Sequence, residues 1–222
     1  MKSGSAHDSR ENMSMLICFA VRQEAAPFRK LASGKSGVSI LMTGIGRKNA
    51  ETAVGQVLAL DSPQHVFTCG FAGGLNPALT IGDAVFETSD AALHVKFVAA
   101  GAKPAKFFCA SRVAVTAAEK AEMRSTTGAD AVEMESEAIH TLCHERGIRC
   151  ATVRVISDAA NDDLPLDFNQ LAKPDLSLDY GKLALAIAKS PGKIPALLRL
   201  RKNTKLAAER LAGALAKVIW PR

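Results

Sequence analysis

The chain has 222 residues, of which 48% are hydrophobic and 5% aromatic, and a formal net charge of +6. This length suits one α/β domain with a buried sheet and is short for two independent cores. Ordinary glycine and proline contents exclude collagen-like and low-complexity chains. We expect a disordered tail over residues 1–13, which are polar and mixed in charge, and a single domain over residues 14–222.

The positive charge is concentrated near the C-terminus. Residues 189–222 contain nine basic residues and one acid, Glu209, so the rest of the chain has a net charge of −2. A basic segment on a near-neutral body argues against a nucleic-acid partner. Five cysteines without a C-x-x-C pair favour a reducing compartment, and the first apolar run is too short for a signal peptide. We expect a cytoplasmic protein.

The first half of the chain alternates predicted strands and helices. Strands are expected at residues 15–21, 37–44 and 65–70, because each is an apolar run of strand length. Helices are expected at residues 22–32 and 46–60, and Pro27 should lie in the first turn of its helix or break it. The third strand is expected to lead into a loop at residues 71–83.

The second half continues this alternation and ends in helices. Strands are predicted at residues 84–89, 94–100, 129–135 and 150–158, and helices at residues 115–127, 136–147, 180–190, 194–200 and 205–219. Buried strands followed by helices indicate a sheet covered on both faces. The predicted fold is a three-layer α/β/α sandwich around a mixed, largely parallel sheet.

A glycine cluster follows the third predicted strand. Ligands in such folds bind at the carboxyl ends of strands, so this segment is a candidate site wall. Gly70, Gly73 and Gly74 would let backbone N–H groups approach a phosphate, a ribose or a water molecule. By itself, however, the cluster is better explained as a tight turn without a ligand.

Acidic residues alternate at the predicted strand-to-helix junction near Met134. On a strand, Glu133 and Glu135 would share a face, and one of them would point inward toward a ligand or a cation. The alternative is a solvated acidic helix start, where carboxylates favour the helix dipole. We adopt that alternative for Glu137 and expect Glu135 to face the site.

A third group, Arg154, Ser157 and Asp158, ends the predicted strand at residues 150–158. A buried carboxylate at the end of a strand can hydrogen-bond a heteroaromatic leaving group and act as a general acid. The alternative is that Asp158 caps a following helix, since Ser157 and Asn161 are also capping residues.

The order of several motifs is more specific than any one of them. TGIG (43–46), CGFAGGL (69–75), GDAVFETSD (82–90), VEMESEA (132–138) and VRVISD (153–158) together resemble the purine nucleoside phosphorylase and methylthioadenosine/S-adenosylhomocysteine nucleosidase superfamily. The resemblance covers about residues 15–188. The segment SPGKIPALLRLRKNTKLAAERL, which follows DDLP, looks most like the hopanoid-associated phosphorylases, which take adenine off an adenosyl-hopane intermediate.

This resemblance implies a phosphorylase/hydrolase-like fold and cleavage of a purine nucleoside without a metal or an organic cofactor. It implies that Asp158, with Ser157 beside it, binds the purine, that Glu135 binds the ribose hydroxyls and that Met134 packs on the sugar. Glu24 falls where nucleosidases keep the carboxylate that prepares a water molecule for attack. The remaining residues predicted to contact or orient the substrate are Ile45, Gly70, Phe71, Ala72, Gly73, Glu133 and Arg154.

Phe71 departs from the pattern, because nucleosidases and many phosphorylases have a serine there that touches the nucleophile. Arg22 and Arg47 are candidates to bind phosphate instead, and both are equally well explained as surface residues. We expect phosphorolysis with inorganic phosphate as co-substrate. The alternatives are a hydrolytic nucleosidase and a nucleoside-binding module without turnover.

The partners expected are a small purine nucleoside and further copies of the chain, as the resemblance implies. No metal is expected, since His140 and His144 lack a third ligand. The basic C-terminus is also expected to contact an anionic membrane, at the inner face, through a stripe formed by Leu197, Leu198, Leu206, Leu211, Leu215, Ile219 and Trp220. The alternative is that this stripe packs on the domain.

Overall fold

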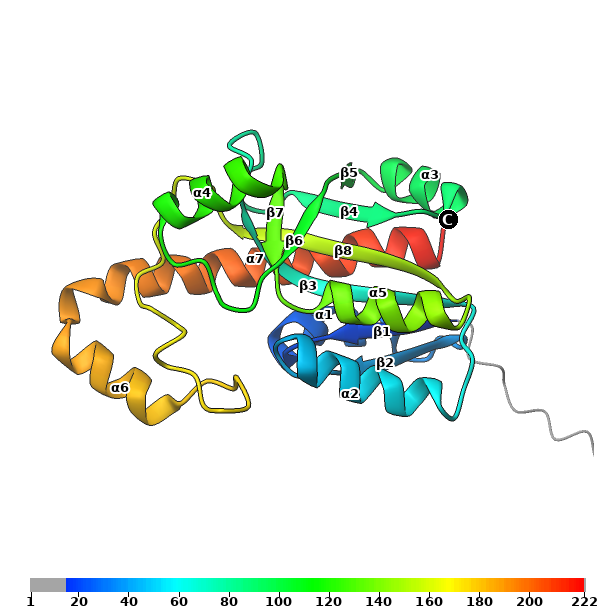
Figure 1. The fold of residues 1–222 in the computed structure, drawn as a ribbon, viewed down its shortest axis with the longest axis horizontal. Coiled ribbons are helices and arrows are strands. Elements are labelled where there is room, and N and C mark those ends of the chain that lie inside the picture. The colour runs from blue at the N-terminus through cyan, green and yellow to red at the C-terminus, as the bar shows by residue number, and fades with distance from the viewer. Residues whose placement is uncertain (1–14, 222) are drawn as a thin grey trace, which may run out of the picture.

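Eight strands form one mixed sheet within residues 15–221, the part of the chain that the computed structural model describes (Figure 1). The predicted tail, residues 1–13, lies outside the described residues. Along the sheet the strands are β2 (Val38–Met42), β1 (Met15–Phe19), β3 (His65–Gly74), β8 (Arg149–Asp158), β4 (Ala84–Thr88) and β5 (Lys103–Pro104). The short strands β6 (Phe107–Cys109) and β7 (Ala131–Glu133) join it through β3.

The central strands β2, β1, β3 and β8 are parallel, whereas β4 runs antiparallel to β8, and β7 antiparallel to β3. The carboxyl ends of β1, β3 and β8 therefore meet at one edge of the sheet. This arrangement confirms the predicted largely parallel sheet. It also brings together the segments that follow β1, β3 and β8, which lie far apart in the sequence.

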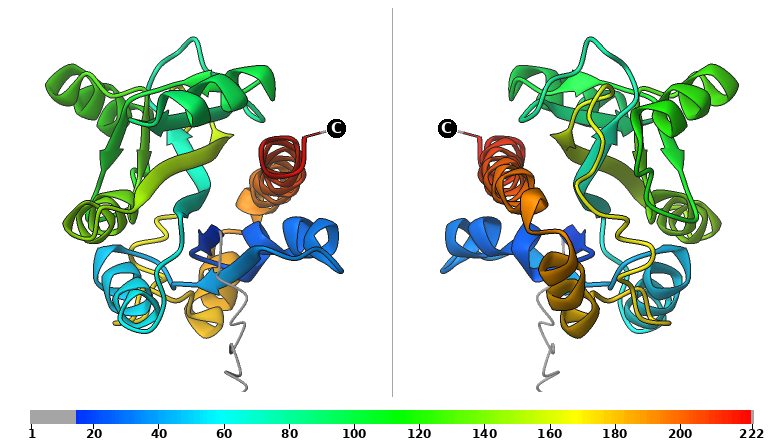
Figure 2. Two further views of the ribbon diagram at one scale, coloured as in Figure 1. Left: turned by 90° about the vertical axis from the view of Figure 1, so that its right-hand side faces the viewer. Right: turned by 90° about the vertical axis from the view of Figure 1, so that its left-hand side faces the viewer.

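Helices cover both faces of the sheet, so the three layers are also confirmed. Figure 2 shows α1 (Arg22–Ala32) and α7 (Ile194–Ile219) on one side and α2 (Arg47–Leu58) and α5 (Ser136–Glu145) on the other. The remaining helical segments are α3 (Ala91–Ala99), α4 (Ala117–Thr127), α6 (Tyr180–Lys189) and the short 3-10 helix η1 (Pro191–Lys193).

Two apolar clusters hold the layers together. On the α1/α7 face, Phe28, Phe67, Phe97 and Leu211 are fully buried in one cluster. On the opposite face, Val54 of α2 packs with residues of α5 and β1 in a second cluster. Burial of a large apolar side chain contributes about 1.5–3 kcal/mol, so both helical layers are held mainly by these contacts.

The prediction of a strand at residues 94–100 is wrong, because most of this segment belongs to helix α3. Asp90 caps this helix, and its Oδ1 accepts hydrogen bonds from the backbone N–H groups of Ala92 and Leu93 at 2.8 and 3.0 Å. Leu93 and Phe97, four residues apart, are the buried positions of the helix. The cap and this spacing outweigh the β-branched composition of the segment.

Two other boundaries differ from prediction. Helix α1 continues through Pro27, which lies inside it beyond the first turn, so the proline neither starts nor breaks the helix. Residues 194–200 and 205–219 belong to a single 26-residue helix, α7, because residues 201–204 are also helical. The predicted end of α4 at Gly128 is confirmed, since Gly128 has the left-handed φ of 65°.

Candidate active site

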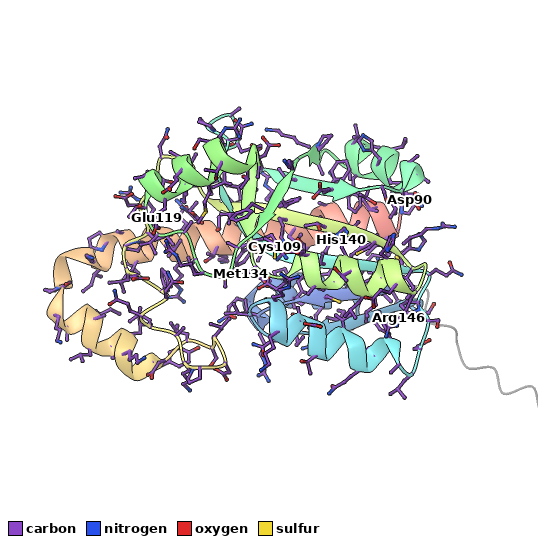
Figure 3. All side chains as sticks on the ribbon, viewed as in Figure 1. Asp90, Cys109, Glu119, Met134, His140 and Arg146 are labelled. Atoms are coloured by element: carbon purple, nitrogen blue, oxygen red, sulfur yellow. The ribbon has the colours of Figure 1, made fainter. Side chains whose placement is uncertain are left out.

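A pocket of about 260 Å³ lies where the carboxyl ends of β1, β3 and β8 meet. Ten of the predicted residues line it: Glu24, Ile45, Phe71, Ala72, Gly73, Glu133, Met134, Glu135, Ser157 and Asp158. Figure 3 labels Met134 at the junction of β7 and α5, and Glu119 near the start of α4. The structure therefore brings together motifs that are more than 130 residues apart in the chain.

The glycine segment forms one wall of this pocket as a strand, although we predicted a loop from residue 71. β3 continues to Gly74 and pairs with β8 on one side and with β7 on the other. A register shift between Ala72 and Gly73 lets Gly73 pair with Asp158. The wall is consequently held by strand pairing on both sides.

Glu24 is fixed in the pocket by backbone hydrogen bonds. Its Oε2 accepts from the N–H groups of Ala20 and Val21, each at 3.1 Å, and its Oε1 accepts from the N–H of Phe71 at 2.8 Å. Burial raises the pKa of Glu24 to about 7, although the nearby Arg154 charge acts in the opposite direction. A carboxylate with this pKa can accept a proton near neutral pH.

Arg154 lies beneath the pocket and does not line it. Its guanidinium Nη2 donates to Glu133, to Glu135 at 3.2 Å and to the hydroxyl of Thr68 at 3.1 Å. The side chain is almost completely buried, and burial alone would lower its pKa, but the surrounding carboxylates raise it. Arg154 thus acts on the site by holding the glutamates that surround it.

Glu133 and Glu135 do not share a strand face as predicted, since β7 ends at Glu133 and Glu135 precedes the first residue of α5. The Glu133 carboxylate accepts from Arg154, from the N–H and hydroxyl of Ser136 and from the N–H of Glu135. Although burial opposes ionisation, these partners hold the pKa of Glu133 below its ordinary value. Its side chain is 0% exposed, so its role is to hold neighbouring groups.

The Glu135 carboxylate is the one that reaches the pocket. Its Oε1 accepts from the N–H of Gly46 at 2.9 Å, and its side chain remains 8% exposed. Burial raises the pKa of Glu135 above its ordinary value, and Arg154 opposes that rise. The hydrogen bond to Gly46 links it to the TGIG segment, beside Ile45.

Gly70 does not line the pocket, but it allows the buried groups to approach one another. A Cβ atom at Gly70 would lie 2.5 Å from Nη1 of Arg154 and 2.6 Å from Oε1 of Glu24. Any side chain there would displace one of these two groups. The glycine is therefore required by the site's packing, which neither of our sequence interpretations considered.

Asp158 faces the pocket at the end of β8, and both of its oxygens already accept hydrogen bonds. The hydroxyl of Ser157 donates to Oδ1 at 2.7 Å, and Nζ of Lys120 donates to Oδ2 at 2.5 Å. No helix follows β8 directly, so Asp158 does not act as the helix cap that we considered. No motif or periodicity in the sequence predicted Lys120 at this position.

Neither Arg22 nor Arg47 lines the pocket. Arg47 forms an exposed ion pair with Glu137, with Nη2 and Oε1 separated by 3.0 Å. Arg112 lines the pocket instead, together with Val113, Ala114 and Leu164, none of which we predicted. Those residues belong to segments without strand or motif signals, so the sequence pattern could not identify them.

Among residues 15–221, no three histidine, cysteine, aspartate or glutamate side chains are grouped in a way that could hold a metal ion. Glu24, Glu135 and Asp158 are among the residues that line the pocket, and each carries a carboxylate. Carboxylates so placed can stabilise positive charge on a bound molecule and exchange protons with it.

Comparison with known proteins places the chain in a family. The profile of the Phosphorylase superfamily matches residues 17–108 and 106–188. The 5'-methylthioadenosine/S-adenosylhomocysteine nucleosidase of Glaesserella parasuis is 28% identical in an alignment of 178 positions that covers 64% of this chain and 77% of that protein. The corresponding nucleosidase of Shewanella sp. is 29% identical in an alignment of 188 positions that covers 68% of this chain and 81% of its own length.

Solved structures show the same fold. The nucleosidase of Neisseria meningitidis in complex with methylthio-immucillin-A superposes with a TM-score of 0.72 at 19% identity, covering 93% of this chain and 98% of the other. Futalosine hydrolase of Helicobacter pylori gives a TM-score of 0.70 at 17% identity, covering 95% and 99%. The profile match extends over most of the chain and confirms the predicted superfamily, so this chain belongs to the Phosphorylase superfamily and is an enzyme.

Proposed function

We propose that the enzyme hydrolyses the N-glycosidic bond of an adenosyl-type purine nucleoside. In this proposal Asp158 contacts the purine, Glu135 binds the ribose hydroxyls, Met134 packs on the sugar and Glu24 accepts a proton from the attacking water. The observation that carries the proposal is the environment of Glu24, which is held by three backbone N–H groups and has a pKa of about 7. The relatives with comparable sequences are nucleosidases.

The placement of charge agrees with this chemistry. As the bond breaks, positive charge develops on the ribose and negative charge on the departing purine. Glu24 and Glu135 would lie on the side of the developing positive charge, and the Asp158–Lys120 pair on the side of the purine. Each group would interact more strongly with the transition state than with the bound nucleoside, which is the requirement for catalysis.

Phosphorolysis, which we predicted from the sequence, depended on Arg22 or Arg47 as phosphate ligands. Both lie outside the pocket, and Arg47 is engaged by Glu137. A phosphate dianion at Glu24 would also be repelled by that carboxylate when it is ionised. Phe71, despite lacking a hydroxyl, still donates its backbone N–H to Glu24. These observations favour water as the nucleophile.

The nucleophile can be tested by incubating the enzyme with 5'-methylthioadenosine with and without inorganic phosphate. We expect adenine release at the same rate in both samples and a free sugar as the second product. A rate that rises with phosphate, accompanied by a sugar 1-phosphate, would establish phosphorolysis instead. Absence of adenine in both samples would favour the third alternative, a binding module.

We also propose contact with an anionic membrane, through a surface that differs from the predicted stripe. Leu211 and Leu215 are fully buried, and Trp220 stacks on Phe28 with ring centroids 5.7 Å apart. The C-terminal half of α7 therefore packs on the domain. The half that stays exposed, together with α6 and η1, forms a hairpin at residues 180–206 that extends away from the sheet in Figure 1.

This hairpin is basic and apolar at the same time. It contains no acidic residue and seven exposed basic residues: Lys182, Lys189, Lys193, Arg199, Arg201, Lys202 and Lys205. Its apolar side chains are exposed as well: Tyr180 is 69% exposed, Leu185 56% and Leu198 58%. Such a combination is typical of surfaces that bind anionic bilayers. It therefore supports a lipid-linked adenosyl compound as the substrate, such as the adenosyl-hopane that the resemblance implies. No described helix is long and apolar enough to cross a membrane.

Sedimentation with vesicles tests the membrane contact. Because each basic residue near an anionic surface contributes about 1 kcal/mol, the Lys189→Gln/Lys193→Gln variant should bind anionic vesicles about 30-fold more weakly than wild type. Binding should also fall as salt rises. The matched control is Lys96→Gln/Lys217→Gln, because both lysines lie outside the hairpin. Equal binding to neutral and anionic vesicles would refute the proposal.

Association with further copies of the chain stays a prediction.

A further inference from the structure

Lys120 is the one buried residue of helix α4, and its side chain is 0% exposed. Lysine is almost never fully buried unless it is paired. Here Nζ donates to Oδ2 of Asp158 at 2.5 Å and to the carbonyl oxygens of Ala159 and Asp162 at 2.8 and 2.9 Å. All three ammonium hydrogens are therefore used.

The position of Lys120 relative to the pocket is as informative as its contacts. Asp158 lines the pocket with a side chain that is 12% exposed, whereas Lys120 does not line it. The ammonium thus lies behind the carboxylate and meets a bound molecule only through it. A buried ion pair often contributes little to stability compared with apolar residues of similar size, so stability alone does not account for this pair.

We propose that Lys120 is a positioning residue for Asp158 and the source of the proton that reaches the departing purine. The inference rests on the proposed function, in which Asp158 contacts the purine. Lys120 fixes Oδ2 while the Ser157 hydroxyl fixes Oδ1, so the carboxylate is held from both sides.

In the proposed reaction one proton moves from Lys120 through Asp158 to the purine, and another moves from water to Glu24. When the C–N bond to the ribose breaks, its electron pair stays with the purine. Asp158 gives a proton to a ring nitrogen of the purine as it accepts one from Nζ of Lys120, so the carboxylate is regenerated and Lys120 becomes a neutral amine. The attacking water forms the new C–O bond and loses its proton to Glu24. Lys120 regains a proton from solvent, and Glu24 releases one, after the products leave.

The alternative is that Lys120 only holds the turn at residues 159–162, through the two carbonyl oxygens. Other ionisable groups also lie in this region. They are Asp162 and Asp163 near the turn, Glu119 in the first turn of α4, Arg112 in the segment before α4, Glu24, Glu133 and Glu135 of the pocket, and Arg154, which contacts the pocket glutamates. A test must therefore separate an effect through Asp158 from an effect on the turn.

A double-mutant cycle with Asp158→Asn makes that separation, with adenine release from 5'-methylthioadenosine as the readout. In the wild-type background, Lys120→Met should lower kcat about 100-fold at pH 7.5 and change KM less than about threefold. In the Asp158→Asn background the same substitution should lower kcat by less than about threefold, because the residue it acts through is already changed.

The pH dependence supplies a second readout. Without the ammonium, the proton that reaches the purine has to come from solvent, which supplies protons more readily as the pH falls. The ratio of Lys120→Met activity to wild-type activity should therefore rise as pH is lowered from 8 to 6. Lys106→Met is the matched control, since Lys106 also donates to a backbone carbonyl, that of Thr127, but lies outside the pocket. It should change neither the rate nor the pH profile.

Lys120→Gln covers the case in which the methionine variant does not fold, because glutamine can still donate to the turn. Thermal unfolding and binding of adenine identify folded variants. A Lys120→Gln enzyme with wild-type kcat and pH profile would overturn the inference, as would equal losses from Lys120→Met in both backgrounds. A wild-type enzyme that releases no adenine would contradict the proposed function instead.

Discussion

Asp158→Asn is expected to lower kcat at least about 100-fold, because the amide cannot pass a proton to the departing purine. KM should change less, since the amide still accepts a hydrogen bond from Ser157 or from the bound molecule. The variant should also lose about 3 kcal/mol of unfolding free energy, because the fully buried Lys120 loses its charged partner. Steady-state kinetics and urea denaturation measure the two effects.

Asp83→Asn is the matched control for this variant. It removes an Asp–Lys pair too, with Lys103, but the lysine is 52% exposed and the pair lies outside the pocket. Exposed pairs contribute about 0–1 kcal/mol, so activity and stability should stay close to wild type. Near-normal kcat in Asp158→Asn would remove Asp158 from its assigned role.

Glu24→Gln is expected to reduce kcat by about 100-fold or more, because glutamine cannot accept a proton from water. In the wild-type enzyme kcat/KM should fall as pH decreases through about 7, where Glu24 becomes protonated. Glu137→Gln is the matched control, since Glu137 is 54% exposed and lies outside the pocket. A glutamine variant that retains the wild-type rate and pH profile would exclude Glu24 as the base.

The raised pKa of Glu24 also makes the free energy of unfolding depend on pH. Between its ordinary value of 4.5 and about 7, the folded state binds a proton that the unfolded state has released. The free energy of unfolding should therefore fall as pH rises through this range, by an amount on the order of 3 kcal/mol. Glu24→Gln should remove this dependence, as urea denaturation at pH 5 and pH 8 would show.

The sequence predicted the parts of the site that follow buried strands. Glu24 and Asp158 each come soon after a strand of the parallel part of the sheet, and the carboxyl ends of parallel strands meet at one edge, so their convergence was foreseeable. Glu135 follows β7, which is antiparallel to β3, and it was indicated by the family resemblance. Local signals also predicted the end of α4 at Gly128.

Contacts between segments that are far apart in the chain could not be predicted from the sequence pattern. The strand character of residues 71–74 depends on pairing with β7 and β8, which no local pattern reveals. Lys120 is 38 residues from Asp158, and a lysine on a helix with many polar residues looks like a solvent-facing one. Helix α3 shows the opposite case, because the cap residue Asp90 is a local signal that our strand prediction for residues 94–100 did not use.

The continuity of α7 determines how the hairpin moves. One uninterrupted helix of about 39 Å runs from the exposed hairpin into the buried cluster beneath the sheet. The α7 part of the hairpin is thus joined to the packed core by continuous helix and not by a loop. An enzyme held to a surface by this helix would keep the pocket at a fixed height and angle, and its search for substrate would become lateral diffusion in two dimensions.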